Sequence, residues 1–141
     1  MGRIMGIDFG ERRIGVALSD PLGMAAHPFS IITRRSNADD IAAIETAARE
    51  NEVIRIVIGL PLNMDGTPGR LTENVQRFGR LLEEKLKLPV EYYDERLTTW
   101  EAERILVEEA DMSREKRKKV RDKLAASFIL QAYLDKHPGQ L

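Results

Sequence analysis

The sequence predicts a mixed α/β fold with a single five-stranded sheet flanked by helices. Three short β-type runs come first, separated by a few polar or turn residues, which is typical of antiparallel hairpins. Strand-like runs then alternate with segments of helical periodicity. A strand–helix–strand unit requires a right-handed crossover and a parallel pair of strands. We therefore expect hairpins followed by parallel strands in one sheet.

The hairpin strands are predicted at residues 3–8, 14–19 and 28–33. The first ends in Asp8, close to a glycine that suits a turn. We expect this strand to lie centrally, beside a strand predicted at residues 54–59. Functional groups should then gather beyond the carboxyl ends of the central strands.

The rest of the chain follows from capping and periodicity. Asn37 is a good N-cap for a helix with apolar residues at helical spacing. Residues 54–59 are β-branched and almost continuously apolar, which indicates a buried strand. Residues 61–69, rich in proline and glycine, must form a loop.

A second amphipathic helix is predicted around residues 71–86, followed by a strand at 90–93. Thr98 and Glu101 form a capping-box pattern that starts a third helix. Ser113 can cap a last helix that runs to about Lys136. Without internal repeats or linkers, residues 1–141 should form a single domain.

Composition narrows the class of protein. The chain has 141 residues and 43% apolar residues, enough for a core, and no cysteine, which excludes disulfides, zinc thiolate sites and cysteine nucleophiles. No apolar stretch suits a signal peptide or a membrane span, so we expect a cytoplasmic protein without a membrane partner. The formal net charge of −1 excludes a uniformly basic surface.

Three acidic residues are candidates for one site. Asp8 ends the first strand, Glu95 follows the last one, and Asp122 shares a helical stripe with Ala125 and Ala126 that should pack on the sheet. Carboxylates gathered in this way suit Mg²⁺ or Mn²⁺. Separately, Asp8 could form a turn, Glu95 could cap a turn or pair with a neighbour, and Asp122 could be solvated.

Basic residues crowd the start of the last helix, around Asp122. A solvated helix face is one explanation, but their position beside a proposed metal ligand favours contacts with a nucleic-acid backbone. The loop residues Asn63, Asp65 and Gly66 could touch substrate, position Glu95 or serve ordinary turns. The basic residues are Arg114, Lys116, Arg117, Lys118, Lys119, Arg121 and Lys123, with Arg12, Arg13, Arg34 and Arg35 as an extension.

Four motifs occur in order: GIDFGERRIG at 6–15, GLPLNMDG at 59–66, DERLTT at 94–99 and DKLAA at 122–126. With them the chain closely resembles the YqgF/RuvX family over essentially its whole length. The resemblance implies an RNase H-like fold, and the family's acidic positions fall on Asp8, Glu95 and Asp122. RuvC-type resolvases of the wider superfamily carry an acid where Gly59 stands here, so Glu95 would have to substitute for it.

The resemblance implies a metal-dependent endonuclease that processes the 5′ end of pre-16S rRNA in ribosome biogenesis. The alternatives are a Holliday junction resolvase acting on branched DNA, or a noncatalytic ribosome-assembly module that binds nucleic acid. The Asp8-Phe9-Gly10 turn also resembles the phosphate loop of actin and sugar kinases, whose ATP site needs two such domains. Ribosomal or processing partners, and a monomer or a homodimer, are compatible with the sequence.

Overall fold

The computed structural model describes residues 2–97 and 113–137, and the helix predicted from Thr98 lies outside them. Five strands form one sheet in the order β3-β2-β1-β4-β5. In chain order the described elements are β1 (Arg3–Phe9), β2 (Arg13–Ser19), β3 (Ala26–Thr33), α1 (Asn37–Glu50), β4 (Val53–Leu60), α2 (Thr72–Leu86), β5 (Val90–Asp94), the short 3₁₀ turn η1 (Glu95–Leu97) and α4 (Arg114–Lys136).

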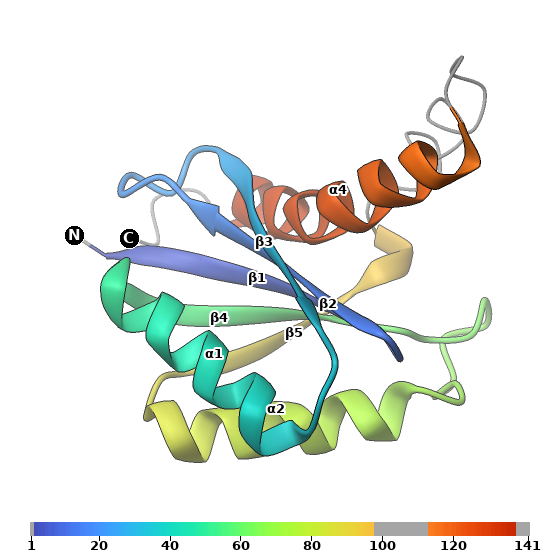
Figure 1. Ribbon diagram of the computed structural model, residues 1–141, viewed down its shortest axis with the longest axis horizontal. Coiled ribbons are helices and arrows are strands. Elements are labelled where there is room, and N and C mark those ends of the chain that lie inside the picture. Colours follow the sequence, from blue (N-terminus) through green and yellow to red (C-terminus); the bar gives the residue numbers. More distant parts are fainter. Residues whose placement is uncertain (1, 98–112, 138–141) are drawn as a thin grey trace.

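The pairing confirms the predicted mixed sheet. Strands β1, β2 and β3 form antiparallel hairpins, whereas β4 runs parallel to both β1 and β5. β1 is therefore the central strand, and its carboxyl end lies beside that of β4 (Figure 1). This edge of the sheet is where the sequence predicts the functional groups.

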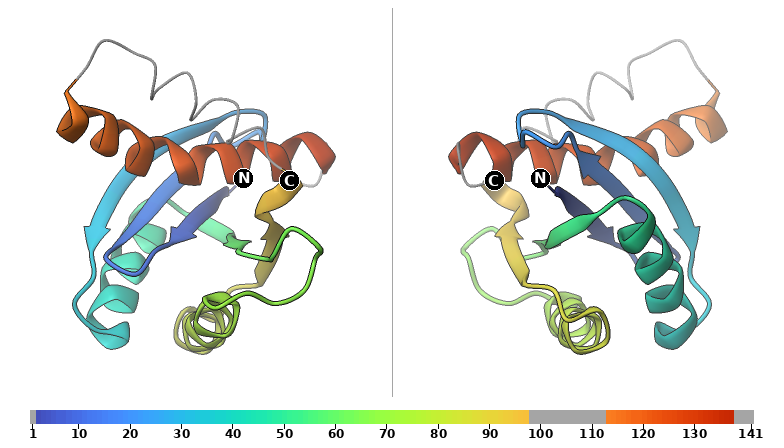
Figure 2. Two further views of the ribbon diagram at one scale, coloured as in Figure 1. Left: turned by 90° about the vertical axis from the view of Figure 1, so that its right-hand side faces the viewer. Right: turned by 90° about the vertical axis from the view of Figure 1, so that its left-hand side faces the viewer.

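Helices cover both faces of the sheet. α4 crosses one face and α1 and α2 cover the other, as two perpendicular views agree (Figures 1 and 2). The core under α1 and α2 includes Ile44, Phe78 and Leu82, and the core under α4 includes Ala126 and Leu130. Burial of these apolar side chains on both faces holds the sheet in place.

Alternation along β1 decides which face each side chain meets. Met5 and Ile7 belong to the core under α1 and α2, whereas Ile4 belongs to the core under α4. Successive residues of a strand point to opposite faces. Asp8 is therefore on the α4 face, and Phe9 packs on the other side.

The helix starts differ slightly from the prediction. The N-cap of α1 is Ser36, whose side-chain oxygen accepts a hydrogen bond from the backbone N–H of Asp39 at 3.1 Å. Asn37 as N-cap is wrong by one position, because its own side chain accepts from Arg34 instead. The predicted cap of α4 is confirmed, since the Ser113 side chain accepts from the N–H of Lys116. Among the described residues, no helix has the length and apolarity needed to cross a bilayer.

Candidate metal centre and nucleic-acid interface

Asp8 lies next to α4 because glycines on the sheet let this helix approach. Asp8 pairs with Gly15 across the β1–β2 hairpin. A Cβ atom at Gly15 would lie only 3.0 Å from the backbone oxygen of Asp122, and one at Gly6 would lie 2.6 Å from the Cβ of Leu130. The absence of side chains at Gly6 and Gly15 therefore brings the backbone of α4 against the strand that carries Asp8.

Glu95 occupies the space above Gly59. It is the first residue of η1, directly after β5, and the last residues of β5 pair with the end of β4. A Cβ atom at Gly59 would lie 2.8 Å from Oε1 of Glu95 and 2.6 Å from Cδ1 of Ile129. A larger residue at this end of β4 would displace the Glu95 carboxyl group. Glu95 therefore lies next to position 59, and its role as a substitute for an acid there stays a prediction.

The carboxyl groups act on one another electrostatically. Burial, and then the negative charge of Asp122, raise the pKa of Asp8 from 3.8 to about 6. Burial, and then the charges of Asp8 and Asp94, raise the pKa of Glu95 from 4.5 to about 7. Asp8 interacts with both other carboxyl groups, because the charge of Asp122 raises its pKa and its own charge raises the pKa of Glu95. Near neutral pH this cluster holds more protons than exposed carboxylates would.

Asp122 also forms an ion pair with a basic residue of β2. Nη1 of Arg13 lies 3.3 Å from Oδ2 of Asp122, and both side chains are partly exposed. Within residues 2–97 and 113–137, no three acidic or histidine side chains are gathered closely enough to form a finished metal site. The donors are nevertheless all carboxylate oxygens, the ligands that Mg²⁺ and Mn²⁺ prefer. The cluster fits such an ion by its chemistry, and an ion there would compete with Arg13 for the carboxylate of Asp122.

The predicted substrate loop is held mainly by its own side chains. Oδ1 of Asp65 accepts hydrogen bonds from the backbone N–H of Thr67 at 3.0 Å and from its hydroxyl at 2.6 Å. The side-chain amide of Asn63 donates to the same hydroxyl and to the carbonyl of Pro68. Gly66 has a φ of +89°, which favours glycine. Asn63, Asp65 and Gly66 therefore shape the loop.

Arg96 connects this loop to η1. Its guanidinium forms a forked ion pair with Asp94, with the shortest distance 2.6 Å, and its Nη1 donates to the carbonyl of Met64 at 3.0 Å. Arg96 also packs on Gly66, where an added Cβ atom would lie 3.3 Å from its Nη2. These contacts hold in place the backbone of the turn that carries Glu95. This role of Arg96 is not predicted from the sequence, although its place directly after Glu95 is a signal.

A basic groove leads to Asp122. The first turns of α4 carry seven basic and two acidic residues, and project beyond the sheet in Figure 1. A groove of about 740 Å³ is lined by Arg13, Lys116, Lys119 and Lys123, with Asp122 in its wall. Arg12 is exposed in the adjacent hairpin turn. Of the other predicted basic residues on α4, Arg114 and Lys118 are exposed, and Arg117 and Arg121 are half-buried. Lys118 also lines the groove, whereas the exposed Arg35 does not.

Arg34 does not belong to this groove. It lies on the opposite side of the sheet, where its Nε is 2.9 Å from Oδ2 of the buried Asp40. Its guanidinium carbon is 4.5 Å from the centre of the Phe9 ring. The alternation of β1 explains the separation, because Asp8 and Phe9 point to opposite faces.

Comparison with known proteins identifies the family. Residues 2–136 match the family RuvX, described as Holliday junction resolvase. A protein of Ligilactobacillus salivarius named "Putative pre-16S rRNA nuclease" is 53% identical over 137 residues, which cover 96% of this chain and 93% of that protein. A protein of the same name from Syntrophomonas wolfei is 51% identical over 133 residues, with 94% of each chain covered.

Solved structures show the same fold. Thermus thermophilus RuvC in complex with a Holliday junction has a TM-score of 0.59 at 10% identity, covering 96% of this chain and 97% of the other. The Fowlpox virus resolvase bound to Holliday junction DNA has a TM-score of 0.55 at 9% identity, covering 95% and 97%. The chain therefore belongs to the RuvX family and is a nuclease, a hydrolase of phosphodiester bonds, with an RNase H-like fold.

Proposed function

We propose that this chain processes the 5′ end of pre-16S rRNA in the bacterial cytoplasm, with Asp8, Glu95 and Asp122 as its metal-binding carboxylates. The observation that carries the proposal is the gathering of Asp8 and Glu95 at the carboxyl end of the central strands, where burial and neighbouring carboxylates raise the pKa of both. Carboxyl groups held together against their mutual repulsion are typical of a cation site. The names of the relatives support the choice of RNA substrate.

Asp8, Glu95 and Asp122 would together hold Mg²⁺ or Mn²⁺. A divalent ion in such a site lowers the pKa of water and stabilises negative charge on the phosphate oxygens. Asp8 is the anchor, since its backbone is fixed by pairing within the sheet. Asp122, in contrast, is half-exposed and joins the site from the neighbouring helix.

Binding of a cation would change the protonation of Glu95 and the ion pair between Arg13 and Asp122. Without the ion, Glu95 has a pKa of about 7 and holds a proton part of the time near neutral pH, so its carboxylate would have to release that proton to bind a cation. If the carboxylate of Asp122 were taken up by a cation, the guanidinium of Arg13 would lose its partner at the groove and could contact a phosphate. The same exchange of partners would thus complete the acidic site and add a positive charge to the basic groove.

The basic groove grips a backbone without reading its sequence. Lysine and arginine contacts to phosphates fix the position of a nucleic acid and give salt-dependent affinity. Specificity for one precursor end would then come from the shape of the RNA or from a ribosomal or processing partner.

Resolution of branched DNA is the second candidate function. It is favoured by the description of the RuvX family and by the groove, whose positive charge suits either nucleic acid. A resolvase that cuts two symmetric strands would act as a homodimer, whereas a monomer suffices for one RNA end. The third candidate, a noncatalytic assembly module, would bind nucleic acid without cutting it.

The test is cleavage by purified wild type and Asp8→Asn with Mg²⁺ or Mn²⁺, on pre-16S rRNA fragments and four-way DNA junctions side by side. The proposal predicts metal-dependent cleavage of the RNA that is lost in the variant, while the variant still binds. Cleavage of junctions alone would support the resolvase. Salt-sensitive binding with no cleavage of either substrate would support the assembly module, and full activity of Asp8→Asn would overturn the metal site.

A further inference from the structure

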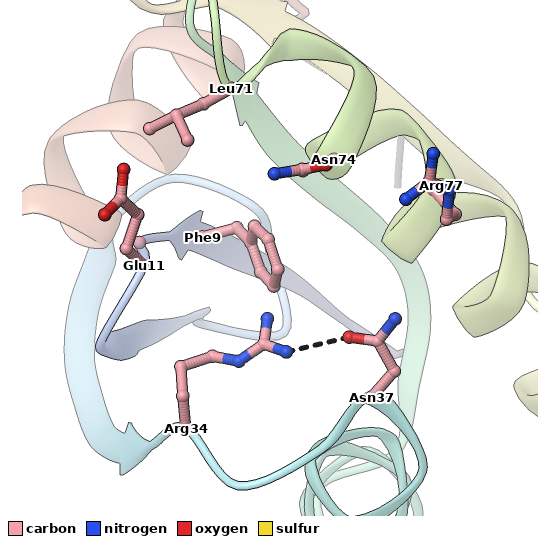
Figure 3. Close-up of a pocket in the computed structure, with 8 residues that line it drawn as sticks. Phe9, Glu11, Arg34, Asn37, Leu71, Asn74 and Arg77 are labelled. Atoms are coloured by element: carbon pink, nitrogen blue, oxygen red, sulfur yellow. Dashed lines mark hydrogen bonds between the residues drawn. The ribbon is translucent and has the colours of Figure 1, made fainter.

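A second pocket opens at the same edge of the sheet, on the other face. It has a volume of about 230 Å³ and lies between the β1–β2 turn, the end of β3 and the start of α2 (Figure 3). Its walls include Phe9, Arg34, Asn37, Asn74 and Arg77. Phe9 follows Asp8 directly in the chain, so this pocket and the acidic site are separated only by the thickness of the sheet.

The pocket contains a fixed planar platform. The Phe9 ring stacks on Phe78 with ring centres 4.5 Å apart, and the guanidinium of Arg34 lies against both rings. Arg34 is held in place by Asp40 at 2.9 Å and by the side-chain oxygen of Asn37 at 2.8 Å. Aromatic rings and arginine guanidinium planes are the groups on which nucleobases stack.

Hydrogen-bonding groups remain available around this platform. In the part of the chain that the structure describes, the Asn37 amide accepts from Arg34 through Oδ1, which leaves its NH₂ group for a ligand. Asn74 is exposed at the opposite wall, and its side chain is directed toward the space above Phe9 in Figure 3. An amide offers both a donor and an acceptor, which matches the edge of a base.

The charges favour a base over a phosphate. Arg34 is neutralised by the buried Asp40, and Arg77 pairs with Glu73 at 3.2 Å. Glu11 adds a carboxylate to the rim, and the apolar side chain of Leu71 forms part of the wall. Glu11 is itself paired with Arg70 at 2.7 Å, and a phosphate would gain little from arginines that are already paired. A neutral, planar, polar-edged group fits all of these residues.

We propose that this pocket binds one nucleobase of the strand whose phosphate lies at Asp8, turned out of its stack. The proposal rests on the function proposed above, because the strand must pass the carboxyl end of β1. Turning out a base is easiest in single-stranded or distorted nucleic acid, where stacking is already weakened. The pocket would then select single-stranded or distorted regions without any need to read the base sequence of a duplex.

The first experiment uses free nucleotides and does not depend on nuclease activity. Nucleoside 5′-monophosphates are titrated into the ¹⁵N-labelled protein, with ribose 5-phosphate as the control that lacks a base. The proposal predicts shifts of the Asn37 and Asn74 side-chain amide signals with a base only. The Asn37 shift should be lost in Asn74→Leu and kept in Gln76→Leu on the same helix. Equal shifts with ribose 5-phosphate, or none with any nucleotide, would overturn it.

The second experiment asks whether the base belongs to the bound strand. Single abasic sites are placed along a substrate oligonucleotide, and binding to Asp8→Asn protein is measured. One position near the cleavage site should weaken binding about tenfold, equivalent to about 1.4 kcal/mol. With Arg77→Ala or Asn74→Leu added, the same abasic site should cause no further loss, whereas Arg80→Ala should behave as the parent.

The outcomes separate the two proposals. If cleavage depends on Asp8 but no abasic position couples to Arg77 or Asn74, only the base pocket falls. If nucleotides bind in the pocket without such coupling, the pocket serves a free nucleotide, and the assignment to the strand is wrong. If the protein cleaves nothing, the nucleotide titration still decides whether the pocket recognises bases.

Discussion

Replacing Asp8 with asparagine should stabilise the metal-free protein while it abolishes cleavage. The carboxyl group has a pKa of about 6 in the folded protein against an ordinary value of 3.8. As the pH rises, the unfolded chain therefore releases this proton first, and the folded state is progressively disfavoured between the two values. The unfavourable free energy is fully developed above pH 6 and absent well below pH 3.8.

The magnitude follows from the shift. About two pKa units correspond to roughly 3 kcal/mol at pH 8. Asparagine keeps the shape of the side chain and carries no charge, so Asp8→Asn should raise the free energy of unfolding by up to this amount. For a chain of this length the melting temperature would rise by roughly 10 °C. At pH 4 the difference should nearly vanish.

The assay is thermal or urea unfolding of both proteins from pH 4 to 8, first with EDTA and then with Mg²⁺. Magnesium should stabilise the wild type more than the variant, because ligands of the folded state act by mass action. Asp65→Asn is the control of opposite sign, since hydrogen bonds from Thr67 lower the pKa of Asp65 and its charge stabilises the loop. Identical pH profiles for the wild type and Asp8→Asn in EDTA would refute the reasoning.

Three further changes test the surroundings of the site. Gly59→Ala should lower the free energy of unfolding by about 1–3 kcal/mol and weaken Mn²⁺ binding, because the new methyl group meets Glu95 and Ile129. Calorimetry that shows neither effect would contradict this close packing. Lys118→Glu with Lys119→Glu should reduce the slope of log affinity against log salt concentration by about 2, and Arg80→Glu with Lys85→Glu on α2 should not. Arg96→Leu should weaken Mn²⁺ binding, measured by titration calorimetry. Arg96→Lys should not restore it, because lysine lacks the forked guanidinium that Asp94 binds. Full rescue by lysine would argue against positioning through that ion pair.

The sheet was predictable because its signals are local. Turn residues between the first three strands indicate hairpins, and the strand–helix–strand order permits one handedness, so β1 had to be central. The same reasoning correctly placed the side of α4 with Ala126 against the sheet. The N-cap of α1 was missed because Ser36 and Asn37 are both good caps, and the choice depends on a contact of Asn37 with Arg34.

The details of the site depend on contacts that no periodicity reports. The pairing of Arg13 with Asp122 requires both the register of β2 and the close approach of α4 over Gly15. The forked contact of Arg96 with Asp94 depends on the tight turn after β5. The separation of Arg34 from the other basic residues depends on its contacts with Asp40 and with the Phe9 ring, on the face of the sheet opposite to Asp8. Sequence therefore indicates which residues gather, whereas the fold decides which of them touch.

Gly6, Gly15 and Gly59 all face α4, and none of them has a side chain that could bind substrate. They set the separation between two layers of the protein, and that separation sets the span that a bound cation must bridge. A survey of single substitutions should accordingly find these three positions as intolerant as the acids themselves. Loss of activity after such a substitution would indicate a changed distance between α4 and the sheet, and not the loss of a group that contacts substrate.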